Sequence, residues 1–177
     1  MPTYHTQLAD ITAAFKNSFG SLTAEQLNHK PNAETWSIAE NMAHLIVINE
    51  TYYPIVAQIR RNEYKLSFFA RFGFLVNWLG GFILKSVERT AQRKIKTFEI
   101  WQPQQSTLNG DILAQFEAHQ TELAAFMASC DDLLAKKQVV ASPANANIVY
   151  TLATAFAIII EHEWRHLAQA KTVLNSL

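Results

Sequence analysis

The chain has 177 residues, of which 49% are hydrophobic and 17% are charged, and its formal net charge is zero. This length fits one domain with a sizeable core, and the apolar content excludes a disordered chain. Gly and Pro number only 5 each, which disfavours a β-sandwich or barrel with many turns. The single cysteine, Cys130, excludes a disulfide framework within the chain. The first residues lack the pattern of a signal peptide, so we expect a cytoplasmic protein.

The zero net charge conceals an uneven distribution. Residues 60–96 contain nine Lys and Arg residues against Glu63 and Glu88, so this segment has a net charge of +7 and the rest of the chain has −7. A basic segment next to an acidic remainder suggests either a charged contact surface or internal complementarity.

The N-terminal part of the chain contains signals for two helices. Apolar residues recur at helical spacing over residues 8–19, and Gly20 predicts the end of this first helix. Thr23 and Gln26 then form the pattern of a capping box, which opens a short turn of helix.

A better capping box, Ser37 with Glu40, predicts the start of a second long helix whose apolar face continues to about Ile59. Pro54 lies within this pattern. Because a helical proline clashes with the carbonyl four residues earlier, we expect a kink or an early end to the helix.

A third long helix is predicted over about residues 111–134 and a fourth over about residues 148–174, with Pro143 in the loop between them. Residues 139–160 carry no charge, but Pro143 and two asparagines interrupt them and leave too short a stretch to span a membrane. No strand-like alternation is evident in the sequence.

The four long helices each carry an apolar stripe that needs a partner, which favours an all-α four-helix bundle. Residues 1–177 are then one domain. A further helical, aromatic-rich segment is expected at about residues 60–100, between the second and third long helices.

Two of the six histidines, His162 and His166, stand four residues apart, and a helix places them on one face where they can bind the same metal ion. The string also fits the zinc-protease pattern, in which Glu163 would be the general base. That class is disfavoured because it takes a third ligand from downstream, where this chain has no His, Cys, Asp or Glu. His44, on the inward stripe of the second helix, is the preferred third ligand; His119 and the carboxylates are the alternatives.

Three imidazoles with an open coordination position are typical of a reactive metal site rather than a closed structural one. Zn²⁺ suits three imidazoles, and Ni²⁺, Fe²⁺ and Mn²⁺ are alternatives. Each ligand needs an acceptor for its other ring nitrogen, and Glu40, Glu161 and Glu163 are near enough in sequence to serve. His119 is either a proton carrier near the metal or, as we favour, a core histidine with one hydrogen bond.

Residues 36–40 (WSIAE), His44, and His162-x-x-x-His166 with Gln169 resemble the DinB-like superfamily of four-helix-bundle proteins. The resemblance covers nearly the whole chain. It implies one divalent metal ion bound by the three histidines just named.

The resemblance also implies a function. The superfamily is associated with DNA-damage-inducible proteins, with bacillithiol and mycothiol S-transferases and with metal-dependent hydrolases. It implies an enzyme that acts on a small-molecule substrate by hydrolysis or by thiol S-transfer, the latter with a low-molecular-weight thiol as cofactor. Glu163 is the candidate catalytic residue.

The alternative is a non-enzymatic, stress-related bundle with a structural or vestigial metal site. Two departures from the family pattern are Ala168, where a glycine is frequent, and the long basic segment.

Residues 66–84 contain six aromatic residues and only one charge, Arg71. We expect this block to pack on the bundle or on a second copy in a homodimer, since homodimers are the commonest oligomers. Peripheral contact with a membrane surface is the less favoured alternative. Nucleic-acid binding is disfavoured because the aromatic residues form a block rather than alternating with cations.

Overall fold

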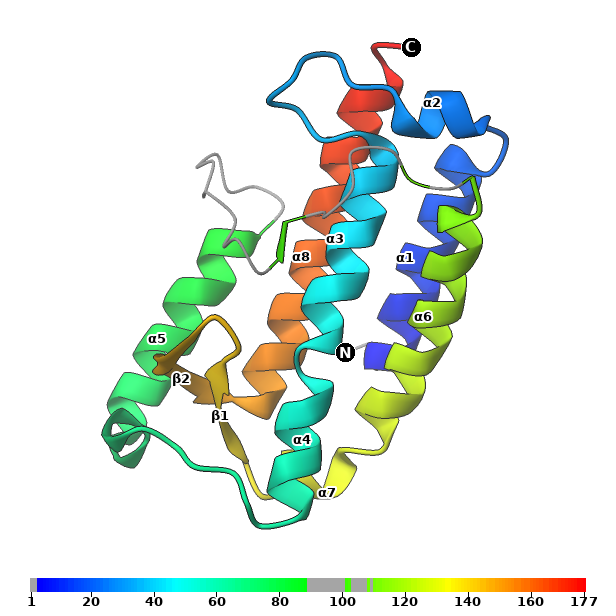
Figure 1. The fold of residues 1–177 in the computed structure, drawn as a ribbon. Coiled ribbons are helices and arrows are strands. Elements are labelled where there is room, and N and C mark those ends of the chain that lie inside the picture. The colour runs from blue at the N-terminus through cyan, green and yellow to red at the C-terminus, as the bar shows by residue number, and fades with distance from the viewer. Residues whose placement is uncertain (1–2, 89–100, 103–107, 109) are drawn as a thin grey trace.

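The computed structural model describes residues 3–88, 101–102, 108 and 110–177, and this part of the chain is mainly helical (Figure 1). Most of the buried core residues belong to α1 (Tyr4–Phe19), α3 (Ile38–Glu50), α6 (Ile112–Ala128) and α8 (Leu152–Leu174). Helices α1 and α3 each pack against both α6 and α8. The core lies between them, and its largest fully buried side chains include Phe15, Phe19, Phe116, Phe156 and Met42.

Local sequence signals account for the N-termini of three helices. Thr3 caps α1, and Thr23 and Gln26 form the predicted capping box of the short α2 (Ala24–Asn28). In the buried box at the start of α3, the Glu40 amide donates to Ser37 Oγ at 3.0 Å and the Ser37 amide donates to Glu40 Oε2 at 2.7 Å. These bonds satisfy amide groups that a helix leaves without a partner, so both boxes are confirmed.

The second long helix ends early, near Pro54, which is one of the two outcomes predicted for this proline. Helix α3 stops at Glu50, and a separate helix, α4 (Tyr53–Arg60), begins with Pro54 in its first turn. Amide groups in the first turn of a helix have no acceptor within the helix, so a proline there costs no helical hydrogen bond.

The predicted third helix over residues 111–134 is wrong at its C-terminal end. Helix α6 stops at Ala128, and α7 (Asp131–Ala135) follows as a separate element. At the break, Ser129 Oγ donates to the Phe126 carbonyl at 2.7 Å, and Arg60 Nη2 from α4 donates to the Ser129 carbonyl at 2.6 Å. Side chains therefore satisfy carbonyls that a continuing helix would use.

The expectation that the chain has no strands is also wrong. An antiparallel hairpin, β1 (Val139–Ser142) and β2 (Asn145–Thr151), follows α7, so α8 begins at Leu152 and not near residue 148. The β-branched and aromatic residues of these strands suit a sheet. Alternation is weak because β2 packs against both α5 and α8, which leaves Val149 and Tyr150 buried although they point to opposite faces.

The predicted extra segment is helical only in part: residues 61–67 form a turn and an irregular stretch, and residues 89–100 lie outside the described part. It comprises a 3₁₀ turn, η1 (Phe68–Arg71), and helix α5 (Gly73–Val87), which packs on β2 and α8. Gly80 makes this packing close, because a Cβ there would lie 2.9 Å from Tyr150 Cβ and 3.0 Å from Thr154 Cγ2. Among the helices described, none is long and apolar enough to cross a membrane.

Candidate metal centre

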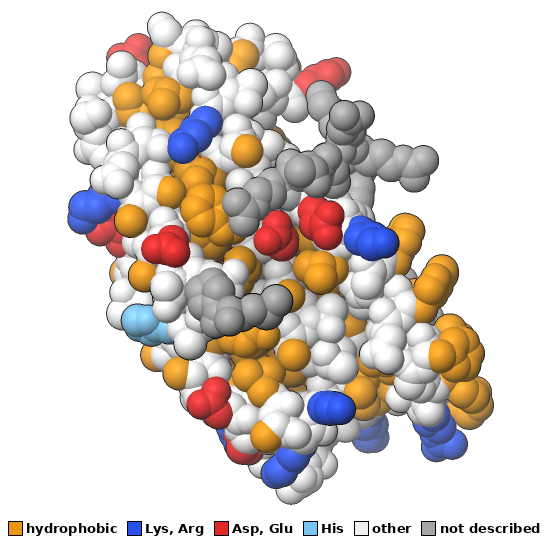
Figure 2. Space-filling model, turned by 180° about the vertical axis from the view of Figure 1, so that it is seen from behind, with side chains coloured by type: hydrophobic (Ala, Val, Ile, Leu, Met, Phe, Trp, Pro, Cys, Tyr) orange, Lys and Arg blue, Asp and Glu red, His pale blue; other side chains and the backbone are white. Residues whose placement is uncertain are grey.

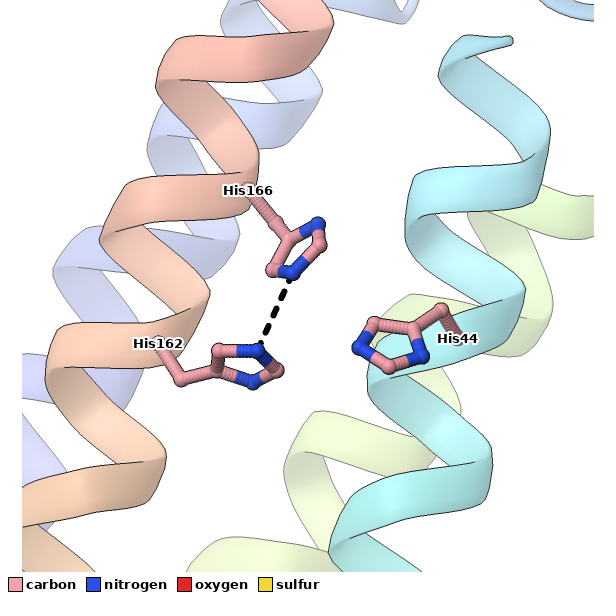
Figure 3. A group of neighbouring side chains, drawn as sticks. All are labelled: His44, His162 and His166. Atoms are coloured by element: carbon pink, nitrogen blue, oxygen red, sulfur yellow. Dashed lines mark hydrogen bonds between the residues drawn. The ribbon is translucent and has the colours of Figure 1, made fainter. Parts of the chain in front are cut away.

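The three predicted ligands come together between α3 and α8 (Figure 3). His162 and His166 lie one turn apart on α8, and His44 faces them from α3. One ring nitrogen from each histidine lies within 4.8 Å of the other two, and the two Nε2 atoms on α8 are 3.1 Å apart. Three nitrogens this close could be bridged by one metal ion.

Hydrogen bonds fix the orientation of two of the rings. His44 Nδ1 is 2.6 Å from the carbonyl oxygen of Trp101, and His166 Nδ1 is 2.7 Å from Asn41 Oδ1. The Asn41 amide is itself oriented, because its Nδ2 donates to the Ser37 carbonyl at 2.8 Å. Both oxygens can only accept, so each Nδ1 carries the proton and each Nε2 presents a lone pair. Ligand histidines are typically held in this way.

The electrostatics of the site favour neutral rings. Burial, with the neighbouring His44 and Arg165, lowers the pKa of His162 to about 3. Burial also lowers the pKa of His44, and burial together with the two other histidines lowers the pKa of His166 well below its usual range. All three imidazoles are therefore deprotonated at neutral pH, which is the form that binds a metal ion.

Trp36 forms part of the wall around the histidines. Its ring centroid lies 4.8 Å from that of His44 and 5.8 Å from that of His166, in a stacked orientation over the latter. Trp36 and His162 are half-buried, whereas His44 and His166 are buried.

The structure places Glu163, the candidate general base, outside the group of converging ligand atoms. Its side chain is fully buried, and Oε1 accepts hydrogen bonds from Asn49 Nδ2 of α3 and Gln120 Nε2 of α6, both at 2.7 Å. Burial raises the pKa of Glu163 to about 7, although these hydrogen bonds act in the opposite direction. The carboxyl group thus joins α8 to two neighbouring helices.

His119 lies in this same buried polar group rather than among the three ligands. Its Nε2 is 3.3 Å from Asn49 Nδ2, and burial lowers its pKa to about 4. This placement agrees with the favoured interpretation of a core histidine with one hydrogen bond.

Sequence reasoning missed the groups that hold the site in place. Asn41 Oδ1 is the acceptor next to His166 Nδ1, while Glu40 is engaged by the Ser37 amide and by Lys30 Nζ at 2.9 Å. A polar residue of low helix propensity inside an apolar helix was a signal for Asn41. The sequence could not reveal the contact between His44 and Trp101, because the acceptor is a backbone carbonyl, which every residue has.

The arrangement fits a divalent metal ion. Two Nε2 lone pairs are oriented and the rings are neutral, so His44, His162 and His166 would supply three nitrogen ligands, which is the donor set of reactive zinc sites. Comparisons with curated proteins and with solved structures gave no significant match. A family model described as the DinB superfamily matches residues 7–170. The match spans most of the chain and includes all three histidines, and the chain therefore belongs to the DinB superfamily.

Proposed function

We propose that helices α1, α3, α6 and α8 form a four-helix bundle that holds one divalent metal ion through His44, His162 and His166, and that the protein is a metal-dependent enzyme acting on a small molecule. The observation that carries this proposal is the convergence of three neutral imidazoles within 4.8 Å. Zn²⁺ fits three imidazole ligands best, with Ni²⁺, Fe²⁺ and Mn²⁺ as alternatives.

The ion would supply Lewis acidity, which activates water for hydrolysis or a low-molecular-weight thiol for S-transfer. The chain's own residues bind and orient. Asn41 and the Trp101 carbonyl hold the protons of His166 and His44 away from the centre of the site. Trp36 covers one side of the rings and restricts the access of water.

Glu163 has a positioning role in this proposal. It links α8 to α3 and α6 next to His162, and its hydrogen bonds to Asn49 and Gln120 leave it no described contact with the three ligands. A role as general base stays a prediction, and the Glu163→Gln variant considered below separates the two.

The alternative is a non-enzymatic bundle with a structural or vestigial site. Its support is the burial of two of the three histidines. The two functions differ in whether a metal ion binds and whether it keeps an exchangeable fourth position.

Metal analysis of the purified protein tests the first point. We expect about one equivalent of metal in the native protein and a loss of most of it in His44→Ala and in His162→Ala. His29→Ala, which removes an exposed histidine outside the group of three converging histidines, is the matched control and retains the metal. Occupancy that survives both site variants contradicts the proposed ligands, and a native protein that binds no added metal supports the vestigial site.

Cobalt substitution tests the second point. The absorption spectrum of Co²⁺-loaded protein reports on its ligands and on their number. An open position predicts a new spectrum when a small thiol is added, whereas a spectrum that no added ligand changes indicates a closed, structural site.

A further inference from the structure

Helix α5 exposes a row of aromatic side chains. Phe74, Trp78 and Phe82 are 70%, 66% and 61% exposed, and their spacing of four residues places them in one stripe. At about 100° per residue, Trp78 lies about 160° around the helix from Gly80, which is the point of closest contact with β2 and α8. The stripe therefore faces away from the body of the protein.

The stripe continues into η1. Phe68 is 63% exposed, its ring centroid lies 5.3 Å from that of Phe72, and Phe72 lies 6.1 Å from Phe74. We call the whole set the aromatic face; it consists of Phe68, Phe69, Phe72, Phe74, Trp78 and Phe82. Figure 2 shows hydrophobic side chains projecting from this margin of the molecule, with Lys and Arg side chains beside them.

The charged residues of the segment that carries the aromatic face are all basic, and Glu63 and Glu88 flank this segment. Residues 64–87 contain Lys65, Arg71 and Lys85 and no Asp or Glu. All three cations are exposed. The Arg71 guanidinium lies 5.4 Å from the centroid of the Phe68 ring, and Lys85 is two turns from Trp78 on the same side of α5.

This charge pattern distinguishes between two occupants of the face. In a two-fold symmetric dimer the same patch meets itself, so the three cations of one copy would lie against a patch to which residues 64–87 contribute further cations and no carboxylate. An anionic lipid surface instead pairs with the cations while the aromatic rings enter the region between headgroups and acyl chains. Phe and Trp are the side chains enriched at such interfaces.

We propose that the aromatic face docks the protein peripherally on an anionic lipid surface, with α5 lying in the plane of the interface. The side chains already point outward and α5 is packed closely on the body at Gly80, so docking requires no unfolding. The proposal is independent of the metal centre, which lies between α3 and α8.

Sedimentation with vesicles tests the proposal. The full-length protein is mixed with vesicles of phosphatidylcholine alone and of phosphatidylcholine with phosphatidylglycerol. We expect it to bind the anionic vesicles at least tenfold more tightly than the neutral ones. Binding should weaken as salt is raised, because exposed charges are screened.

Two sets of substitutions separate the aromatic and the charged contributions. The triple variant Phe74→Ser, Trp78→Ser, Phe82→Ser should lose at least tenfold in binding to the anionic vesicles. A second variant replaces Lys65, Arg71 and Lys85 with Gln. Each lost cation should weaken the affinity for anionic vesicles roughly fivefold, so this variant should lose at least as much affinity as the aromatic variant. Circular dichroism verifies that each variant keeps its helix content.

The matched control for the cation variant replaces three exposed lysines elsewhere, Lys136, Lys137 and Lys171, with Gln, and it should bind vesicles like the native chain. Equal binding of neutral and anionic vesicles, or full binding by the aromatic variant, overturns the proposal. A native protein that ignores vesicles and forms a dimer that the aromatic variant dissociates also overturns it, and assigns the face to a second copy. Light scattering supplies that measurement.

Discussion

The side chain of Asn41 sets the tautomer of His166, because its oxygen accepts the Nδ1 proton and its nitrogen is held by the Ser37 carbonyl. Hydrogen-bond partners of metal-binding histidines orient the ring and raise its basicity, so removing one weakens metal binding even when the ligand itself stays.

We therefore expect Asn41→Ala to lower metal affinity about 10–100-fold, the usual effect of losing such a partner. Competition with a chromophoric chelator measures this affinity. Asn147→Ala, which removes an exposed amide in β2, is the control. An unchanged affinity in Asn41→Ala would show that the Asn41 contact does not orient the ligand.

Glu163 predicts a pH dependence of stability. Its pKa is raised from 4.5 to about 7 by burial, so the folded state binds the proton more strongly than the unfolded state. The resulting stabilisation is fully present below the unfolded pKa and is lost as the pH rises through about 7. Gln is isosteric with Glu but does not ionise, so the Glu163→Gln variant should not lose this stability as the pH rises.

Relative to the native chain, Glu163→Gln should therefore gain roughly 2–3 kcal/mol in free energy of unfolding between pH 5 and pH 8. Urea unfolding of the metal-free proteins measures the difference, and Glu122→Gln, at an exposed site on α6, is the matched control. If Glu163→Gln keeps its metal and its activity, the positioning role is supported. Loss of activity with the metal still bound would instead support a general base.

At the scale of the secondary-structure element, Gly80 allows α5 to pack closely on β2 and α8 because it has no side chain. A Cβ at Gly80 would lie 2.9 Å from Tyr150 Cβ, a distance that real Cβ atoms essentially never show, whereas a Cβ at Gly81 meets nothing within 4 Å. The two neighbouring glycines thus differ only in what faces them.

Gly80→Ala should lower the free energy of unfolding by about 1–3 kcal/mol, because Tyr150 Cβ, the nearest atom, cannot move without its backbone. Gly81→Ala should raise it by about 0.5–1 kcal/mol through the better helix propensity of alanine. Urea titration of both variants gives the comparison. Equal effects at the two positions would contradict the close packing of α5 on β2.

Elements whose ends are encoded locally were predictable, and elements whose ends depend on distant residues were not. The capping boxes of α2 and α3 involve residues three positions apart. The break after α6 involves Arg60, 69 positions before Ser129. The hairpin was missed because α5 and α8 bury both of its faces, which removes the alternation of polar and apolar residues that reveals a strand.

At the scale of the whole molecule, the candidate site joins two long helices that are far apart in sequence. His44 belongs to α3 and the other two ligands to α8, and Glu163 ties α8 to α6 as well. A ligand that binds only this folded arrangement stabilises the whole chain.

Metal ions should therefore raise the melting temperature. At a free concentration one hundred times the dissociation constant, the stabilisation is about 2.7 kcal/mol, which corresponds to roughly 5–10 °C for a chain of this size. Differential scanning fluorimetry with and without Zn²⁺ measures the shift. His166→Ala should show none of it, and a native protein whose melting temperature ignores every divalent metal would argue against the site.

The sequence by itself determined what depends on neighbours along the chain. Helical periodicity places His162 and His166 on one face whatever the rest of the fold does, and the pattern around His44 marked the third ligand. Tertiary structure alone decided what depends on distant segments. The Trp101 carbonyl reaches His44 across 57 positions, and Asn49 reaches Glu163 across 114. It also decided that the aromatic residues of α5 face outward, because a helix that is apolar on both sides gives no sign of which side the core will take.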